Sequence, residues 1–183
     1  MERTDLTLVI MFAVLNFVFA ALIGQVPRLI TGIPGIGYLF NVFYSITITI
    51  AMLFYQGRRW RFLMQGILFA LLTLFLGATQ DALLSKISLI LNAFVLDLVF
   101  STFYGSFQKK NKLVLWAILG QIYYWVTDSL WMILVFSLFY PWEGVIATWS
   151  IIIPFILPLM VIEAIAGGYL GHRIYQRVNK IQN

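Results

Sequence analysis

The fold of this chain is decided by the stretch from Leu113 to Tyr140, which reads LVLWAILGQIYYWVTDSLWMILVFSLFY. A helix that crosses a membrane needs about 20 consecutive, predominantly apolar residues, and this stretch supplies them. Its second half contains an acid, Asp128, and an acid that faces lipid at a helix centre costs about 2.5–3.5 kcal/mol. The stretch therefore predicts a membrane-spanning helix whose polar face is turned away from lipid.

That polar face offers groups suited to a small ligand. At helical spacing it contains Gln121, Tyr124, Trp125, Asp128 and Trp131. A carboxylate flanked by Trp and Tyr rings suits a flat or cationic ligand, which gains stacking and cation–π contact. The alternative is that these polar groups only hydrogen-bond the helix to its neighbours. The face is either a ligand surface or a packing surface, and we take the first as the working hypothesis.

The composition places the whole chain in a membrane. Of its 183 residues, 62% are hydrophobic and 10% are charged, whereas soluble domains have roughly 25% charged residues. The length accommodates six spans with short loops, so we expect a single transmembrane domain over residues 1–183 and no soluble domain. The chain has no cysteine and one histidine, which argues against thiolate and multi-histidine metal sites. We expect no metal, no cofactor and no nucleic-acid partner.

Six membrane-spanning helices are predicted, at residues 6–24, 38–55, 60–76, 82–104, 113–140 and 145–175. The first is interpreted as an uncleaved span rather than a signal peptide, because its apolar run is long and no clear cleavage site follows. Residues 25–37 are rich in Gly and Pro and predict a loop, either a lid over a site or a plain connector. Pro154 and Pro158 predict a kink or a break in the last helix.

The basic residues give the expected orientation. Alternating spans place ten of them on one side: Arg3, Arg58, Arg59, Arg61, Lys109, Lys110, Lys112, Arg173, Arg177 and Lys180. The other side has only Arg28 and Lys86. Because basic loops stay in the cytoplasm, both termini are predicted to be cytoplasmic, in a multi-pass protein of the cell membrane.

This orientation brings several polar residues to a similar depth in the outer half of the membrane. At about 1.5 Å per helical residue, they can converge on one outward-facing pocket. The candidate binding residues are Asn41, Ser88, Asn92, Gln121, Tyr124, Trp125, Asp128, Trp131 and Glu143.

Other intramembrane polar residues are given structural roles. Asp97 and Glu163 fall in the inner halves of their helices, and Asn16 and Gln65 are expected to be interhelical hydrogen-bond partners. No G-x-S-x-G or H-E-x-x-H motif is present, so we expect no enzyme. Three tryptophans near span ends are expected to be interfacial anchors: Trp60, Trp116 and Trp142.

Four stretches of this sequence resemble one known family. They are TGIPGIGY at residues 31–38, the basic turn Gly57–Arg59, LFLG at residues 74–77, and EAIAGGYLG at residues 163–171 followed by the basic RIYQR. Together they resemble the substrate-binding S components of energy-coupling factor vitamin transporters, and most of all the thiamin or hydroxymethylpyrimidine type.

The resemblance implies a division of labour. An S component is a six-helix bundle with cytoplasmic termini that binds a vitamin from outside, while a transmembrane coupling protein and two ATPase subunits drive transport. Small residues at four-residue spacing in the first helix let the coupling protein approach. Here that register reads Ala13, Phe17, Ala21, and Phe17 departs from the pattern.

The residue types favour a cationic aromatic vitamin such as thiamin. Trp and Tyr rings would stack on it, and Asp128 or Glu143 would offset its charge. A neutral flat vitamin such as riboflavin would use the rings with Asn92 or Gln121. The alternatives are a non-catalytic accessory subunit of a larger membrane complex, and a small channel or facilitator.

Overall fold

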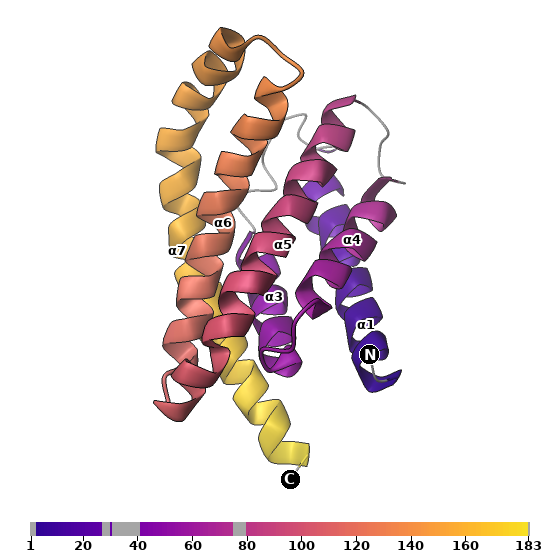
Figure 1. Cartoon of the computed structure of the whole chain (residues 1–183), viewed down its shortest axis with the longest axis vertical. Helices are drawn as coiled ribbons and strands as arrows, with labels where there is room; N and C mark the ends of the chain where they lie inside the picture. Colours follow the sequence, from indigo (N-terminus) through magenta and orange to yellow (C-terminus); the bar gives the residue numbers. More distant parts are fainter. Residues whose placement is uncertain (1–2, 27–29, 31–40, 75–79, 183) are drawn as a thin grey trace.

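The computed structural model describes residues 3–26, 30, 41–74 and 80–182, and every regular element in these ranges is helical. In chain order the elements are α1 (Arg3–Phe19), the π-helical η1 (Ala20–Gln25), α3 (Asn41–Tyr55), α4 (Arg61–Thr73), α5 (Gln80–Lys109), α6 (Leu113–Ser137) and α7 (Trp142–Gln182). Helix α1 begins and α7 ends at the same end of the bundle (Figure 1).

Four of the described segments are long and apolar enough to cross a membrane. They are Thr4–Ile23, Leu83–Lys109, Leu113–Ser137 and Ile153–Lys180. Helices α3 and α4 are also apolar but shorter, at 15 and 13 residues. The all-helical fold and a membrane location are thus as the sequence predicted.

The structure differs from the predictions at the end of α5 and within α7. Helix α5 continues to Lys109, five residues past its predicted end at 104. Helix α7 runs without interruption through Pro154 and Pro158. The prediction of a break at these prolines is therefore wrong. Both prolines are exposed and lie one turn apart, so their rings interrupt no core packing. The predicted lid at 25–37 lies almost wholly outside the described residues, and Gln25 belongs to η1.

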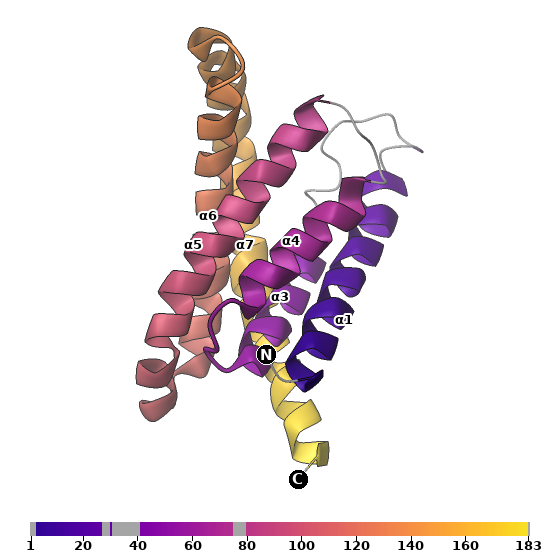
Figure 2. The same cartoon turned by 45° about the vertical axis from the view of Figure 1, so that its right-hand side comes forward.

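The helices close into a ring. Each packs against the next in the order α7, α6, α5, α4, α1 and α3, and α3 returns to α7. Helix α3 also contacts α4 and α6, so it borders four neighbours and most of its length is buried. Figure 2 shows the connected ends of α6 and α7 extending beyond the other helices as a hairpin.

Three glycines in α7 allow close contacts with neighbouring helices. A Cβ added to Gly171 would lie 2.7 Å from the Thr49 Cβ of α3, and one on Gly167 would overlap Ser45. One on Gly168 would lie 2.8 Å from the Ile118 Cα of α6. Small residues at this spacing let membrane helices approach closely. The EAIAGGYLG stretch is therefore the packing seam of α7 against α3 and α6.

An ion-pair cluster closes the end of the bundle where α1 begins. Asp5 is 1% exposed, and its carboxylate oxygens lie 2.5 Å from Arg58 Nη1 and 2.6 Å from Arg61 Nη2. The α5–α6 connection, with Lys110 and Lys112, lies at the same end (Figure 1). We call this the basic end. The pairing ties α1 to the connection between α3 and α4.

A second acid, Asp97 of α5, caps the start of α4. Its two carboxylate oxygens accept the backbone N–H groups of Trp60, at 3.0 Å, and Leu63, at 2.9 Å. The first N–H groups of a helix have no partner inside the helix, and an acid there also favours the helix dipole. The structural role predicted for Asp97 is confirmed.

Candidate functional site

The nine candidate binding residues fall in three places. Ser88, Asn92, Tyr124, Asp128 and Trp131 belong to the facing helices α5 and α6. Asn41, Gln121 and Trp125 lie where α3 meets α6 and α7, which we call the α3 seam. Glu143 is exposed in the first turn of α7, at the tip of the hairpin.

Hydrogen bonds hold the α5–α6 face together. The Asn92 side-chain amide donates to the Tyr124 carbonyl at 2.9 Å and accepts from the Thr127 hydroxyl at 2.5 Å. The Ser88 hydroxyl lies 2.8 Å from the Ser85 carbonyl and 2.9 Å from the Met132 sulfur. Asn92 and Ser88 are both fully buried. Much of their hydrogen-bonding capacity is therefore used between helices.

Asp128 faces a cation across this contact. Lys86 of α5 interacts electrostatically with it, and both side chains are half-buried. The direct ion pairs among the described residues all involve Asp5, so Lys86 and Asp128 are coupled without close contact. Sequence reasoning used Lys86 only to orient the chain, although its place two residues before Ser88 put it at the same depth. The site thus combines an acid with a nearby base, rather than an acid alone.

The α3 seam positions the two other α6 candidates. The indole N–H of Trp125 donates to the Ser45 hydroxyl at 2.8 Å. One turn earlier, Gln121 is fully buried, and its amide nitrogen lies 3.9 Å from the Met52 sulfur. Ser45 also faces Gly167. The seam therefore places polar α6 side chains directly against α3, at the level of the α7 glycines.

Glu163 of α7 lies at the start of α3. It accepts backbone hydrogen bonds from Asn41 and Val42, so it does for α3 what Asp97 does for α4. Asn41, predicted as a ligand contact, is 5% exposed at this helix start. The structural role predicted for Glu163 is confirmed.

Polar atoms without partners concentrate on the seam. Among the described residues, four of its buried side-chain atoms have no hydrogen-bond partner: Asn41 Nδ2, Thr49 Oγ1, Gln121 Oε1 and Glu163 Oε2. Each such atom costs about 1–3 kcal/mol of desolvation. The seam therefore offers donors and acceptors that a polar ligand can use.

Trp116 corrects one prediction. Its interfacial anchoring role is wrong, because the side chain is 2% exposed and its indole N–H donates to the Phe100 carbonyl at 3.2 Å. The physical reason is that α6 packs against α5, where the rings of Phe100 and Tyr104 lie against the indole. Trp60 and Trp142, at 48% and 56% exposed, lie at the surface as expected of anchors.

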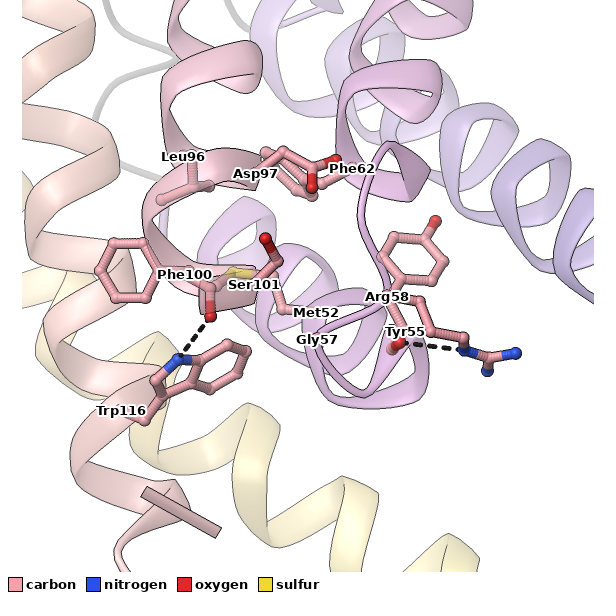
Figure 3. Close-up of a pocket in the computed structure, with 10 residues that line it drawn as sticks. All are labelled: Met52, Tyr55, Gly57, Arg58, Phe62, Leu96, Asp97, Phe100, Ser101 and Trp116. Atoms are coloured by element: carbon pink, nitrogen blue, oxygen red, sulfur yellow. Dashed lines mark hydrogen bonds between the residues drawn. The ribbon is translucent and has the colours of Figure 1, made fainter. Parts of the chain in front are cut away.

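Two small cavities lie inside the bundle, each of about 20 Å³. The central cavity is lined by Asn16, Tyr44, Ile48, Phe62, Gln65, Gly66, Phe69, Leu89, Ala93 and Tyr124. The end pocket, at the basic end, is lined by Met52, Tyr55, Gly57, Arg58, Phe62, Leu96, Asp97, Phe100, Ser101 and Trp116 (Figure 3). Such volumes hold about one water, whereas ligand pockets span about 300–1,000 Å³. Neither of these two cavities is large enough to hold a vitamin.

Comparisons with known proteins add no family to this arrangement. The chain matches no protein-family model, no curated protein and no solved structure. Its function is therefore argued from its own residues.

Proposed function

We propose that the chain is the membrane-embedded substrate-binding subunit of an energy-coupling-factor-type vitamin transporter. It has six membrane spans and cytoplasmic termini, and it captures thiamin or a related pyrimidine or aromatic vitamin from outside the cell. Its partners are a transmembrane coupling protein and two ATPase subunits. The chain itself is not an enzyme.

The observation that carries the proposal is the polar face of α6 in an otherwise apolar chain. It combines Asp128, the rings of Tyr124 and Trp125, and the amide of Gln121, whose Oε1 has no partner among the described residues. Rings beside an acid and an amide are what a charged heteroaromatic ligand requires.

The arrangement of the helices supports the proposed orientation. The α3–α4 and α5–α6 connections contain four basic residues, at positions 58, 59, 110 and 112, and Arg61 is the first residue of α4. Both connections lie at the end where α1 begins and α7 ends (Figure 1). Basic connections at one end favour that end as cytoplasmic. In this orientation Asp128 lies in the outer half of α6.

Lys86 narrows the ligand chemistry. Lys86 partly offsets the charge of Asp128. An ion pair with Asp128 alone would therefore bind a cation weakly, and a ligand also needs stacking or hydrogen bonds at this site. A singly charged ring system with hydrogen-bonding nitrogens, such as thiamin, would use Asp128 together with the Gln121 amide. A polyanion would meet the single cation Lys86 and the acid Asp128, so binding of polyanions is disfavoured.

The test is a titration of the purified protein alone, with its six tryptophans as fluorescence reporters. The panel is thiamin, hydroxymethylpyrimidine, riboflavin and other vitamins. We expect saturable quenching at sub-micromolar thiamin or hydroxymethylpyrimidine. Folded protein that responds to none of them, and that copurifies with a large partner, would instead support the accessory-subunit alternative. Solute flux in liposomes without ATPases would support a channel or facilitator.

Asp128→Asn is expected to weaken a cationic ligand by about 1 kcal/mol or more, because it removes a charged hydrogen-bond partner. Glu143→Gln, at the exposed hairpin tip, is the companion variant and separates the two acids assigned to the site. The measurement is the same fluorescence titration. Unchanged affinity in Asp128→Asn would remove Asp128 from the site.

A further inference from the structure

The two cavities follow one another along the same four helices. From the central cavity to the end pocket, the lining moves along α3 from Tyr44 and Ile48 to Met52 and Tyr55. It moves in the same sense along α4, α5 and α6, each by one to three turns. The cavities are therefore arranged in series, from the bundle centre toward the basic end.

Phe62 is the one side chain that lines both cavities in the described part of the chain. It is 7% exposed, and its ring lies edge-on to Tyr124, with centroids 6.1 Å apart at 87°. Figure 3 shows Phe62 beside Asp97 at the inner border of the end pocket. The ring therefore lies between the two spaces.

The backbone on either side of Phe62 is held firmly. The N–H groups of Trp60 and Leu63 both donate to the Asp97 carboxylate. Arg61 is paired with Asp5. Trp60 also has a positive φ of 71°, which turns the chain sharply into α4. These contacts fix the backbone of residue 62 from both sides and leave the ring free to rotate about its side-chain bonds.

The walls of the two spaces differ in polarity. In the central cavity Asn16 accepts from Thr47 at 2.7 Å, and Gln65 accepts from Tyr55 at 2.8 Å. The wall of the end pocket is mostly apolar, and the Asp97 carboxylate there already accepts two backbone N–H groups. Cavities of this size hold water when polar groups line them. The central side of Phe62 is thus suited to water, and the end pocket continues the passage as a mostly apolar segment.

We propose that Phe62 is a barrier side chain between two halves of an internal passage, which leads water or a small polar solute from the bundle centre to the basic end. The proposal concerns permeation through the bundle and does not rest on vitamin binding. A phenyl ring closes the passage by filling the constriction, and its displacement joins the two cavities.

The chain has no cysteine, so single cysteines can report access to each space. Leu89→Cys reports the central cavity and Ser101→Cys reports the end pocket. The probe is Ag⁺, a thiol-reactive ion small enough for these spaces. The readout is the loss, over time, of thiol that a fluorescent maleimide can label after denaturation.

In a Phe62→Ala background, Leu89→Cys is expected to react about tenfold faster, because removing the ring joins the cavities. Two matched controls also remove a phenyl ring, but each ring lines only one of the two cavities. Phe69 lines the central cavity and Phe100 the end pocket, and Phe69→Ala and Phe100→Ala should leave the rate within about twofold. Ser101→Cys should react equally in all backgrounds.

Phe62→Leu keeps the proposal testable if Phe62→Ala does not fold, and it should give a smaller increase in the same direction. Fast reaction of Leu89→Cys with Phe62 intact would overturn the proposal. A slow reaction in folded Phe62→Ala or Phe62→Leu protein would also overturn it, as would an equal increase in Phe69→Ala. Because no vitamin is used, these outcomes are independent of the titration above.

Discussion

The basic end and the α3 seam differ in how many of their buried polar atoms lack a hydrogen-bond partner among the described residues: Arg61 Nε at the basic end, and four atoms on the seam. At the basic end, the carboxylates of Asp5 and Asp97 meet two arginines and two backbone N–H groups. On the seam, Asn41, Thr49 and Gln121 each retain a buried atom without a hydrogen-bond partner among the described residues. The first region gains stability from its polar groups, whereas the second gives up stability and keeps them available.

The largest effect is expected where the charges are most completely paired. Asp5→Ala leaves Arg61, 19% exposed at its side chain, without its acid. Losing one partner of a buried pair costs about 3–5 kcal/mol. Unfolding by SDS in mixed micelles measures the loss, and Arg59→Ala, at an exposed neighbouring position, is the control.

A loss below about 1 kcal/mol for Asp5→Ala would class the pair with exposed salt bridges. The basic end would then gain little stability from its paired charges, and the contrast with the α3 seam would not hold.

An intermediate effect is expected from the glycine contacts that press α7 onto α3. Gly171→Ala places a Cβ 2.7 Å from Thr49 Cβ and 2.9 Å from the Ile46 carbonyl, so the helices must separate, at a cost of about 1–3 kcal/mol. In Gly144→Ala the new Cβ meets nothing within 4 Å, and the same unfolding assay should show no loss. Equal stability of the two variants would contradict the packing described for the seam.

The smallest effect is expected at the seam's own glutamine. Gln121→Leu removes an oxygen that has no partner, so stability should change by less than about 1 kcal/mol. Gln65→Leu is the matched variant, because Gln65 is equally buried but accepts from the Tyr55 hydroxyl. It should lose about 1–3 kcal/mol. Equal losses of stability in Gln121→Leu and Gln65→Leu would show that the hydrogen bond of Gln65 adds no stability, which contradicts the prediction.

Hydrophobic runs predicted the helices and their order well, because a span must be apolar over its whole length. Polar residues inside those runs also predicted partners: Asn16 bonds Thr47 and Gln65 bonds Tyr55 across helices. Such groups have no water to bond in a membrane interior, so a protein partner is expected.

Contacts between distant segments could not be predicted in the same way. Asp97 caps a helix that begins more than thirty residues earlier, and Glu163 caps α3 across a larger separation. Both depend on which helix faces meet, which a single sequence does not specify. The burial of Trp116 likewise depends on the contact between α5 and α6, which places Phe100 and Tyr104 against its ring.

The unequal lengths of the helices also matter for how the chain is placed in a bilayer. Helix α4 has 13 described residues and exposes Met64 and Leu71, whereas α7 has 41 and exposes Ile151, Phe155 and Ile162. At 1.5 Å per residue these helices measure about 20 Å and 60 Å, and a typical hydrocarbon core is about 30 Å thick. Helix α7 is therefore about twice as long as the hydrocarbon core is thick, so in a bilayer it must tilt or extend into the water beyond it.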